Sequence, residues 1–141
     1  MILSLIDLIS FEFSGDFDIL VDDDGTAYMI YSQKYYMSIE QLTPDYYYST
    51  GKSYMFSEYF VEAPIFLKKN NIYYALFGWC CCYCLQGSGV LVHTATNPMG
   101  PYTLQVFFSF SRIDQFYWVS FSLEAISLVL LALIVHQYTH H

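Results

Sequence analysis

The chain has 141 residues, a length that accommodates a single domain. Its composition is 55% hydrophobic and 21% aromatic, which supplies a core and favours strands, because aromatic rings pack well on a pleated surface. The formal net charge of −8 argues against a nucleic-acid partner, which requires a basic surface to replace the counterions of the phosphates.

The N-terminal segment, residues 1–15, is apolar and carries no Lys or Arg. A secretory signal peptide has a positively charged start and small residues at its cleavage point, and here Asp7 also interrupts the apolar run. The sequence therefore predicts no signal peptide, and residues 1–15 remain unassigned.

A β-hairpin is predicted in residues 16–32, DFDILVDDDGTAYMIYS, where an Asp-Asp-Asp-Gly turn separates two apolar runs. Glycine supplies the positive φ that a tight hairpin turn requires. Residues 37–43 alternate like a third strand, and a fourth, outer strand is expected near residues 53–56. The three adjacent Asp residues lack the D-x-D-x-D-G spacing of a calcium loop, so the sequence predicts a solvated turn.

The same unit recurs after about 46 residues, so that residues 62–78, EAPIFLKKNNIYYALFG, fall on the first hairpin. Asp16 then aligns with Glu62, and the Asp-Asp-Asp-Gly turn aligns with Lys-Lys-Asn-Asn. The second unit is predicted to run to residue 103, with strands at 63–67, 72–77 and 89–95.

Antiparallel units of this period are typical of β-propeller blades, so the predicted fold is all-β, with about two blades over residues 16–103. Each blade opens with one carboxylate, and blade openings converge on the propeller axis. Asp16 and Glu62 are therefore either a carboxylate pair suited to acid-catalysed glycoside cleavage or polar caps at the mouth of the ring.

An insertion in the second unit contains Trp79, which is either a platform for stacking a sugar ring or a core residue. Four cysteines follow within residues 80–84, too close together for four thiolates to surround one zinc ion. Free thiols or one local disulfide are the expectation, so no metal site is predicted. His93 lies within a predicted strand and is expected to be a packed residue rather than a ligand.

The repeat ends before residues 104–141, a non-matching apolar tail. Residues 116–135 form an apolar run of bilayer-spanning length, interrupted by Glu124, and a helix is expected there. The run is a membrane anchor, a buried helix that covers the open blade edge, or unrelated sequence, and the abrupt change of composition favours the third. A membrane partner is expected only if the first holds.

Three pieces of the sequence resemble glycoside hydrolase family 43: DFDILVDDDGTAYMIYS, QLTPDYYYSTGK and VEAPIFLKKNNIYYALFGW. The resemblance covers residues 16 to about 103 and is strongest to the galactan-hydrolase-like subgroup, in which blades end much as GSGVLVHTATNPMGPYT does here. It implies part of a five-bladed β-propeller that cleaves O-glycosidic bonds of plant-type or galactan polysaccharides with inversion. It also implies an oligo- or polysaccharide partner, no cofactor, and an extracellular location.

By position in these motifs, Glu62 matches the family's general acid, and Asp16 matches the residue that orients this acid and modulates its pKa. Asp18 shares the face of Asp16 in a regular strand but does not match the motif. No part of the chain matches the blade that carries the general base, and Asp7 stands in the wrong context. Two blades alone are expected to be inactive, so the alternatives are a carbohydrate-binding pseudoenzyme and a non-functional fragment.

Overall fold

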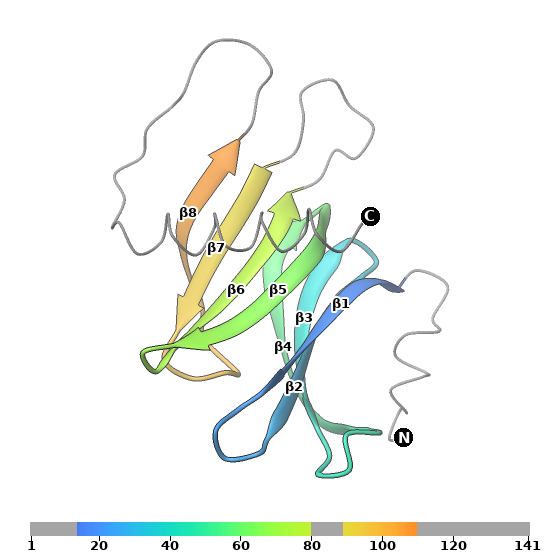
Figure 1. The fold of residues 1–141 in the computed structure, drawn as a ribbon. Helices are drawn as coiled ribbons and strands as arrows, with labels where there is room; N and C mark the ends of the chain where they lie inside the picture. The colour runs from blue at the N-terminus through green and yellow to red at the C-terminus, as the bar shows by residue number, and fades with distance from the viewer. Residues whose placement is uncertain (1–13, 80–88, 110–141) are drawn as a thin grey trace, which may run out of the picture.

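The computed structural model describes residues 14–79 and 89–109, which form two four-stranded antiparallel sheets (Figure 1). The first sheet contains, in order, β1 (Ser14–Val21), β2 (Ala27–Gln33), β3 (Tyr36–Leu42) and β4 (Ser49–Tyr59). The second contains β5 (Val61–Lys69), β6 (Ile72–Trp79), β7 (Gly89–Ala95) and β8 (Thr103–Ser109). The predicted all-β architecture is confirmed for these residues.

The predicted strands agree with the structure except at the outer edges of the sheets. The third strand of the second unit was expected at residues 89–95, and β7 has these bounds. Strand β4 is longer than the expected 53–56, and β8 pairs with β7 as a fourth strand. The second sheet therefore continues through Ser109 instead of ending near residue 103.

The predicted cysteine cluster and the C-terminal helix at 116–135 lie outside the described residues, as does Asp7. Within residues 14–79 and 89–109 there is no helix long and apolar enough to cross a membrane.

The two inner hairpins turn through residues with positive φ, as their sequences require. Gly25 has a φ of 83° in the turn between β1 and β2. Asn70 and Asn71, with φ values of 51° and 60°, make the equivalent turn between β5 and β6, because Asn tolerates the left-handed region better than most residues.

Strand β2 is buried on both faces. In a simple two-sheet sandwich, by contrast, one face of each sheet is exposed to solvent. Tyr28 and Ile30 point toward the second sheet and belong to the main core. Met29 and Tyr31 alternate with them and belong to a separate buried cluster. Burial of both faces is the pattern expected of a propeller blade, which packs between two neighbours.

The main core lies between the two sheets, where β5 packs against β1, β2 and β3 (Figure 1). Phe56 of β4 and Phe77 of β6 meet edge to face across this interface, with ring centroids 4.9 Å apart. The buried residues of this core are Tyr28, Ile30, Met37, Ile39, Phe56, Val61, Phe66, Tyr73, Ala75, Phe77 and Leu91.

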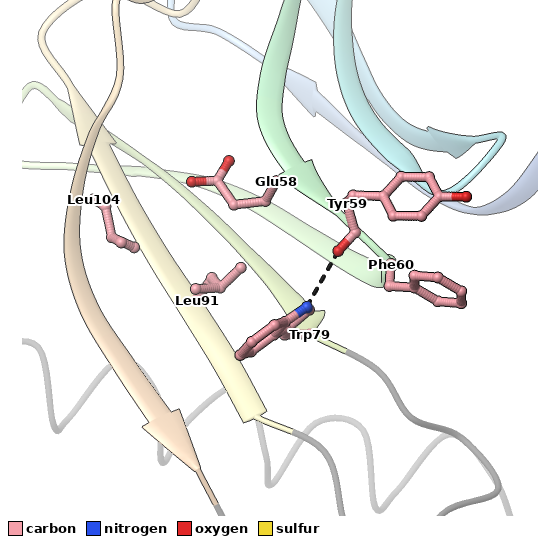
Figure 2. Close-up of a pocket in the computed structure, with 6 residues that line it drawn as sticks. All are labelled: Glu58, Tyr59, Phe60, Trp79, Leu91 and Leu104. Carbon is pink, nitrogen blue, oxygen red and sulfur yellow. Dashed lines mark hydrogen bonds between the residues drawn. The ribbon is translucent and has the colours of Figure 1, made fainter.

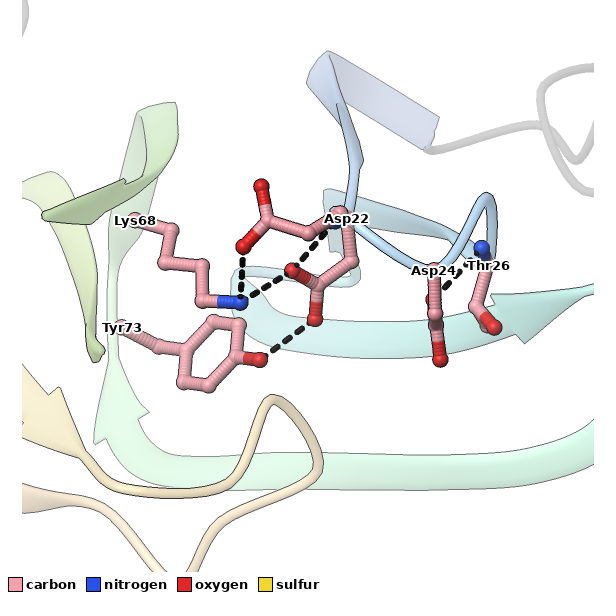
Figure 3. Close-up of polar contacts among 6 residues, drawn as sticks. Asp22, Asp24, Thr26, Lys68 and Tyr73 are labelled. Atoms are coloured by element: carbon pink, nitrogen blue, oxygen red, sulfur yellow. Dashed lines mark hydrogen bonds and ion pairs between the residues drawn. The ribbon is translucent and has the colours of Figure 1, made fainter.

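A polar contact joins the two hairpin turns (Figure 3). The Lys68 ammonium lies 2.5 Å from the Asp22 carboxylate and 2.8 Å from that of Asp23, and the Tyr73 hydroxyl donates to Asp22. The Asp22 side chain is only 9% exposed. The prediction of a solvated turn is therefore wrong for Asp22, because the second sheet covers it and supplies its counter-charge.

The pKa values of this contact reflect its geometry. Burial raises the pKa of Asp22, but hydrogen bonds from Lys68, Tyr73 and the Asp23 amide outweigh burial and lower it below its ordinary value. The two carboxylates raise the pKa of Lys68. The contact is therefore charged on both sides over the whole neutral range.

We expect Phe56→Ala to lower the free energy of unfolding by about 3–5 kcal/mol, because the ring is 2% exposed and leaves a cavity between the sheets. Met55→Ala is the matched control: Met55 is the neighbouring residue and is 66% exposed, so the expected loss is within about 0.5 kcal/mol. Denaturant unfolding followed by circular dichroism measures both, and equal losses would contradict the inter-sheet core.

We expect the coupling between Asp22→Asn and Lys68→Met, measured as a double-mutant cycle of unfolding free energies, to depend on pH. Because the folded pKa of Asp22 is lowered, its contribution is complete above the unfolded pKa of about 3.9 and is lost as pH falls through the folded value. Denaturant titrations between about pH 7 and about pH 3 should show the coupling decrease toward the acid end. A coupling that is constant with pH would refute the ion pair.

Candidate active rim

The two strand-opening acids lie at equivalent, irregular points of the two sheets. Asp16 is exposed near the start of β1, where regular pairing with β2 breaks between Ser14 and Phe17. Glu62 is half-buried near the start of β5, where pairing with β6 breaks between Glu62 and Ile65. Such bulges bend a strand and redirect a side chain, and they are enriched beside active sites.

Strand pairing brings both acids to the same end of the sheets. Ser14 pairs with Gln33, Tyr36 pairs with Tyr59, and Val61 pairs with Trp79. In Figure 1, β1 and β5 begin on the same side of the molecule and run in the same general direction. We call this end the rim: residues 14–16, 33–36, 59–62 and 79. The Asp22–Lys68 contact lies at the opposite end of β1 and β5.

The backbone on both sides of Glu62 is strained. Phe60 and Ala63 have positive φ values of 63° and 52°, a region that costs residues with a Cβ about 1–2 kcal/mol each. Ala63 also precedes Pro64, which restricts its backbone further. Positive φ also occurs at Lys34, Tyr35 and Tyr46, but at Phe60 and Ala63 it flanks a strand-opening carboxylate, and residues in such conformations are enriched at functional sites.

Asp18, which shares a strand with Asp16, has a structural role. Its Oδ2 atom accepts a 2.8 Å hydrogen bond from the Phe66 backbone amide of β5, and its Oδ1 atom accepts one from the Ile19 amide. The carboxylate therefore joins the first strands of the two sheets, β1 and β5. The sequence analysis did not assign Asp18 to the site.

Trp79 lines a groove between the two sheets (Figure 2). Its indole Nε1 donates a 3.1 Å hydrogen bond to the Tyr59 carbonyl, and the side chain is 52% exposed. Trp79 pairs with the core residue Val61, whereas Glu62 pairs with Gly78. Because successive side chains of a strand point to opposite faces, Trp79 and Glu62 are directed to different faces of the second sheet.

Sequence reasoning missed Glu58, which lies beside this groove and 3.0 Å from His93 Nε2. The expectation that His93 is packed is confirmed: it is 3% exposed and stacks on Phe77. Burial lowers the pKa of His93 by more than Glu58 raises it, so the ring is neutral at pH 7. Glu58 lies past the end of the strand predicted at 53–56, and only its alternation with Tyr54 and Phe56 in β4 could have indicated it.

Metal coordination has no basis in the part of the chain that the structure describes. No group of three or more His, Cys, Asp or Glu side chains there could hold one ion. The acids of the rim are therefore considered as proton carriers and hydrogen-bond acceptors.

Two four-stranded sheets packed face to face, with their first strands adjacent, are the architecture of neighbouring β-propeller blades. Comparison with solved structures agrees. A family 43 β-1,3-galactosidase, solved with galactodeoxynojirimycin, is 31% identical with a TM-score of 0.55 over 64% of this chain and 26% of its own. An endo-1,4-β-xylanase from Bacteroides thetaiotaomicron is 27% identical with a TM-score of 0.60 over 69% of this chain and 38% of its own.

An exo-β-1,3-galactanase from Phanerochaete chrysosporium, solved with β-1,3-galactotriose, shares the fold at 24% identity and a TM-score of 0.55, over 64% of this chain and 22% of its own. No protein-family model and no curated protein matches the sequence. The chain is related to the glycoside hydrolases of family 43 and matches part of their propeller. It spans well under half the length of the structures that it matches.

We expect Ala63→Gly to raise the free energy of unfolding by up to about 1 kcal/mol, because glycine adopts the positive φ at this position without a steric penalty. Ala75→Gly is the matched control: Ala75 is buried in the middle of β6 and does not have a positive φ, so glycine there should destabilise by about 1 kcal/mol. Denaturant unfolding compares the two. Equal destabilisation would show that the backbone beside Glu62 is relaxed.

Proposed function

We propose that the protein cleaves O-glycosidic bonds of galactan-type saccharides by acid-assisted hydrolysis, with Glu62 as the general acid and Asp16 as the residue that orients it and modulates its pKa. The observation that carries this proposal is the equivalence of the two acids. Each lies at the start of the first strand of its sheet, next to a break in strand pairing, and both occupy the rim.

In this mechanism, Glu62 donates a proton to the glycosidic oxygen as the bond to the anomeric carbon breaks. Water then attacks the anomeric carbon from the face opposite the leaving group and inverts its configuration. The attacking water releases its proton to solvent, and the Glu62 carboxylate takes up a proton from solvent before the next turnover. In this scheme Asp16 acts through Glu62 as its positioning residue, from the equivalent point of the neighbouring sheet. The strained backbone around Glu62 holds its side chain at the rim.

An inverting hydrolase also needs a base that activates water, roughly 6.5–9.5 Å from the acid carboxyl. The described strands open with two acids, Asp16 in the first sheet and Glu62 in the second. Both already have roles in this scheme, so neither is assigned as the base. The family's β-1,3-galactosidase is the relative with the highest sequence identity among those described above, which supports galactosides as substrates.

A second candidate function is carbohydrate binding without hydrolysis. This function is favoured by the strand-opening residues of the two sheets. Asp16 and Glu62 are the acids at these positions among the described strands, and no third strand-opening carboxylate is present there to serve as the base. Such a protein would bind galactosides at the rim and leave them intact.

We expect Glu62→Gln to lower the hydrolysis of β-1,3-galactotriose and of an aryl β-galactoside by about 10²–10⁴-fold, with an unchanged melting temperature. Asp16→Asn should lower it less and shift the acid limb of the pH–rate profile. Asp23→Asn is the control, because this carboxylate is exposed at the opposite end of β1. Full activity of Glu62→Gln would dispose of the assignment. Calorimetric binding of galactotriose with no product after long incubation would establish the second function instead.

A further inference from the structure

The groove beside Trp79 is formed by both sheets and does not include the strand-opening acids. The residues that line it are Glu58, Tyr59, Phe60, Trp79, Leu91 and Leu104. They come from β4, from the link to β5, and from β6, β7 and β8, which are the middle and outer strands of the two units. Its volume is about 540 Å³, within the range of small-molecule sites.

One polar group, the Glu58 carboxylate, is held in place at this groove (Figure 2). His93 Nδ1 is buried with no hydrogen-bond partner among the described residues. A bare lone pair is tolerated there better than a bare N–H, so the proton belongs on Nε2, which donates to Glu58 over 3.0 Å. The His93 ring is itself fixed by stacking on Phe77, with centroids 4.9 Å apart. The remaining acceptor sites of Glu58 are therefore oriented before any ligand arrives.

The Trp79 ring supplies an apolar surface in the same groove. Its N–H bond to the Tyr59 carbonyl restricts rotation of the indole, and about half of the side chain is exposed. Leu91 and Leu104 complete the apolar lining. A groove that combines an indole face with an oriented acceptor suits a ligand with one apolar face and hydroxyl groups at its edge, which is the surface of a pyranose ring.

We propose that this groove is a second saccharide-binding site, in which a galactoside lies on Trp79 and donates a hydroxyl hydrogen bond to Glu58. The choice of galactoside rests on the proposed function. The site is distinct from the candidate acid because Trp79 and Glu62 belong to opposite faces of the second sheet. The groove would hold one part of a polysaccharide near the rim while another part of that polysaccharide reaches Asp16 and Glu62.

The test is a titration of the full-length protein with β-1,3-galactotriose. Binding is monitored through the indole N–H signals of its two tryptophans in ¹⁵N-correlated NMR spectra. Trp79→Phe identifies the Trp79 signal. We expect this signal to shift on titration, Trp79→Ala and Glu58→Gln each to weaken binding by about tenfold or more, and ligand saturation transfer to concentrate on the C–H protons of one ring face.

Two controls separate this site from the proposed active site. Glu62→Gln should keep the shift of the Trp79 signal even where hydrolysis is lost, so hydrolysis and groove binding fail independently. Tyr47→Ala removes another exposed aromatic ring, from the loop between β3 and β4 at the opposite end of the sheets, and should leave binding unchanged.

A Trp79 signal that does not move at saturating galactotriose would overturn the proposal. So would equal binding by the wild type and Glu58→Gln. A shift caused by tetramethylammonium but not by the saccharide would also overturn it, because a carboxylate beside an indole can bind an organic cation instead.

Discussion

Phe56 and Phe77 meet edge to face between the two sheets, and the arrangement of every other feature follows from this packing. A single four-stranded sheet cannot bury both of its faces, yet β2 is buried on both. Each sheet therefore needs a neighbour, and the second sheet supplies the neighbour for one face of the first. This packing sets the two hairpin turns side by side and sets the starts of β1 and β5 at one rim.

The contact between the turns reinforces this arrangement in an unusual way. Asp22 and Lys68 are 46 residues apart, which is the repeat period, so the two partners occupy equivalent positions of the two units. A repeat that conserved its charge there would bring two like charges together. Because the first unit has an Asp at this position and the second unit has a Lys, the two equivalent side chains attract each other instead. Tyr73 and the 9% exposure of Asp22 make the contact part of the interface rather than a surface ion pair.

Strained backbone and exposed side chains are found together at the rim. Positive φ values at Phe60 and Ala63 and a break in strand pairing surround Glu62. Such features are enriched at functional sites, and here they accompany the acid that the family 43-like motifs indicate. On the groove side, Glu58, His93 and Trp79 form a second polar and aromatic group, separated from Glu62 by the second sheet itself.

The sequence by itself determined the local structure: the alternation of residues 89–95 predicts β7, and the Asp-Gly and Asn-Asn turns predict the hairpins, because these depend on near neighbours. The repeat also predicted the equivalence of Asp16 and Glu62, and the motifs in residues 16–103 indicated the resemblance to family 43. Only the tertiary structure decided which acids are structural, because the partners of Asp18 and Asp22 lie 48 and 46 residues away. It likewise added β8 to the second sheet and joined Glu58 to His93, since contacts between distant strands depend on packing and leave no periodic signal in the chain.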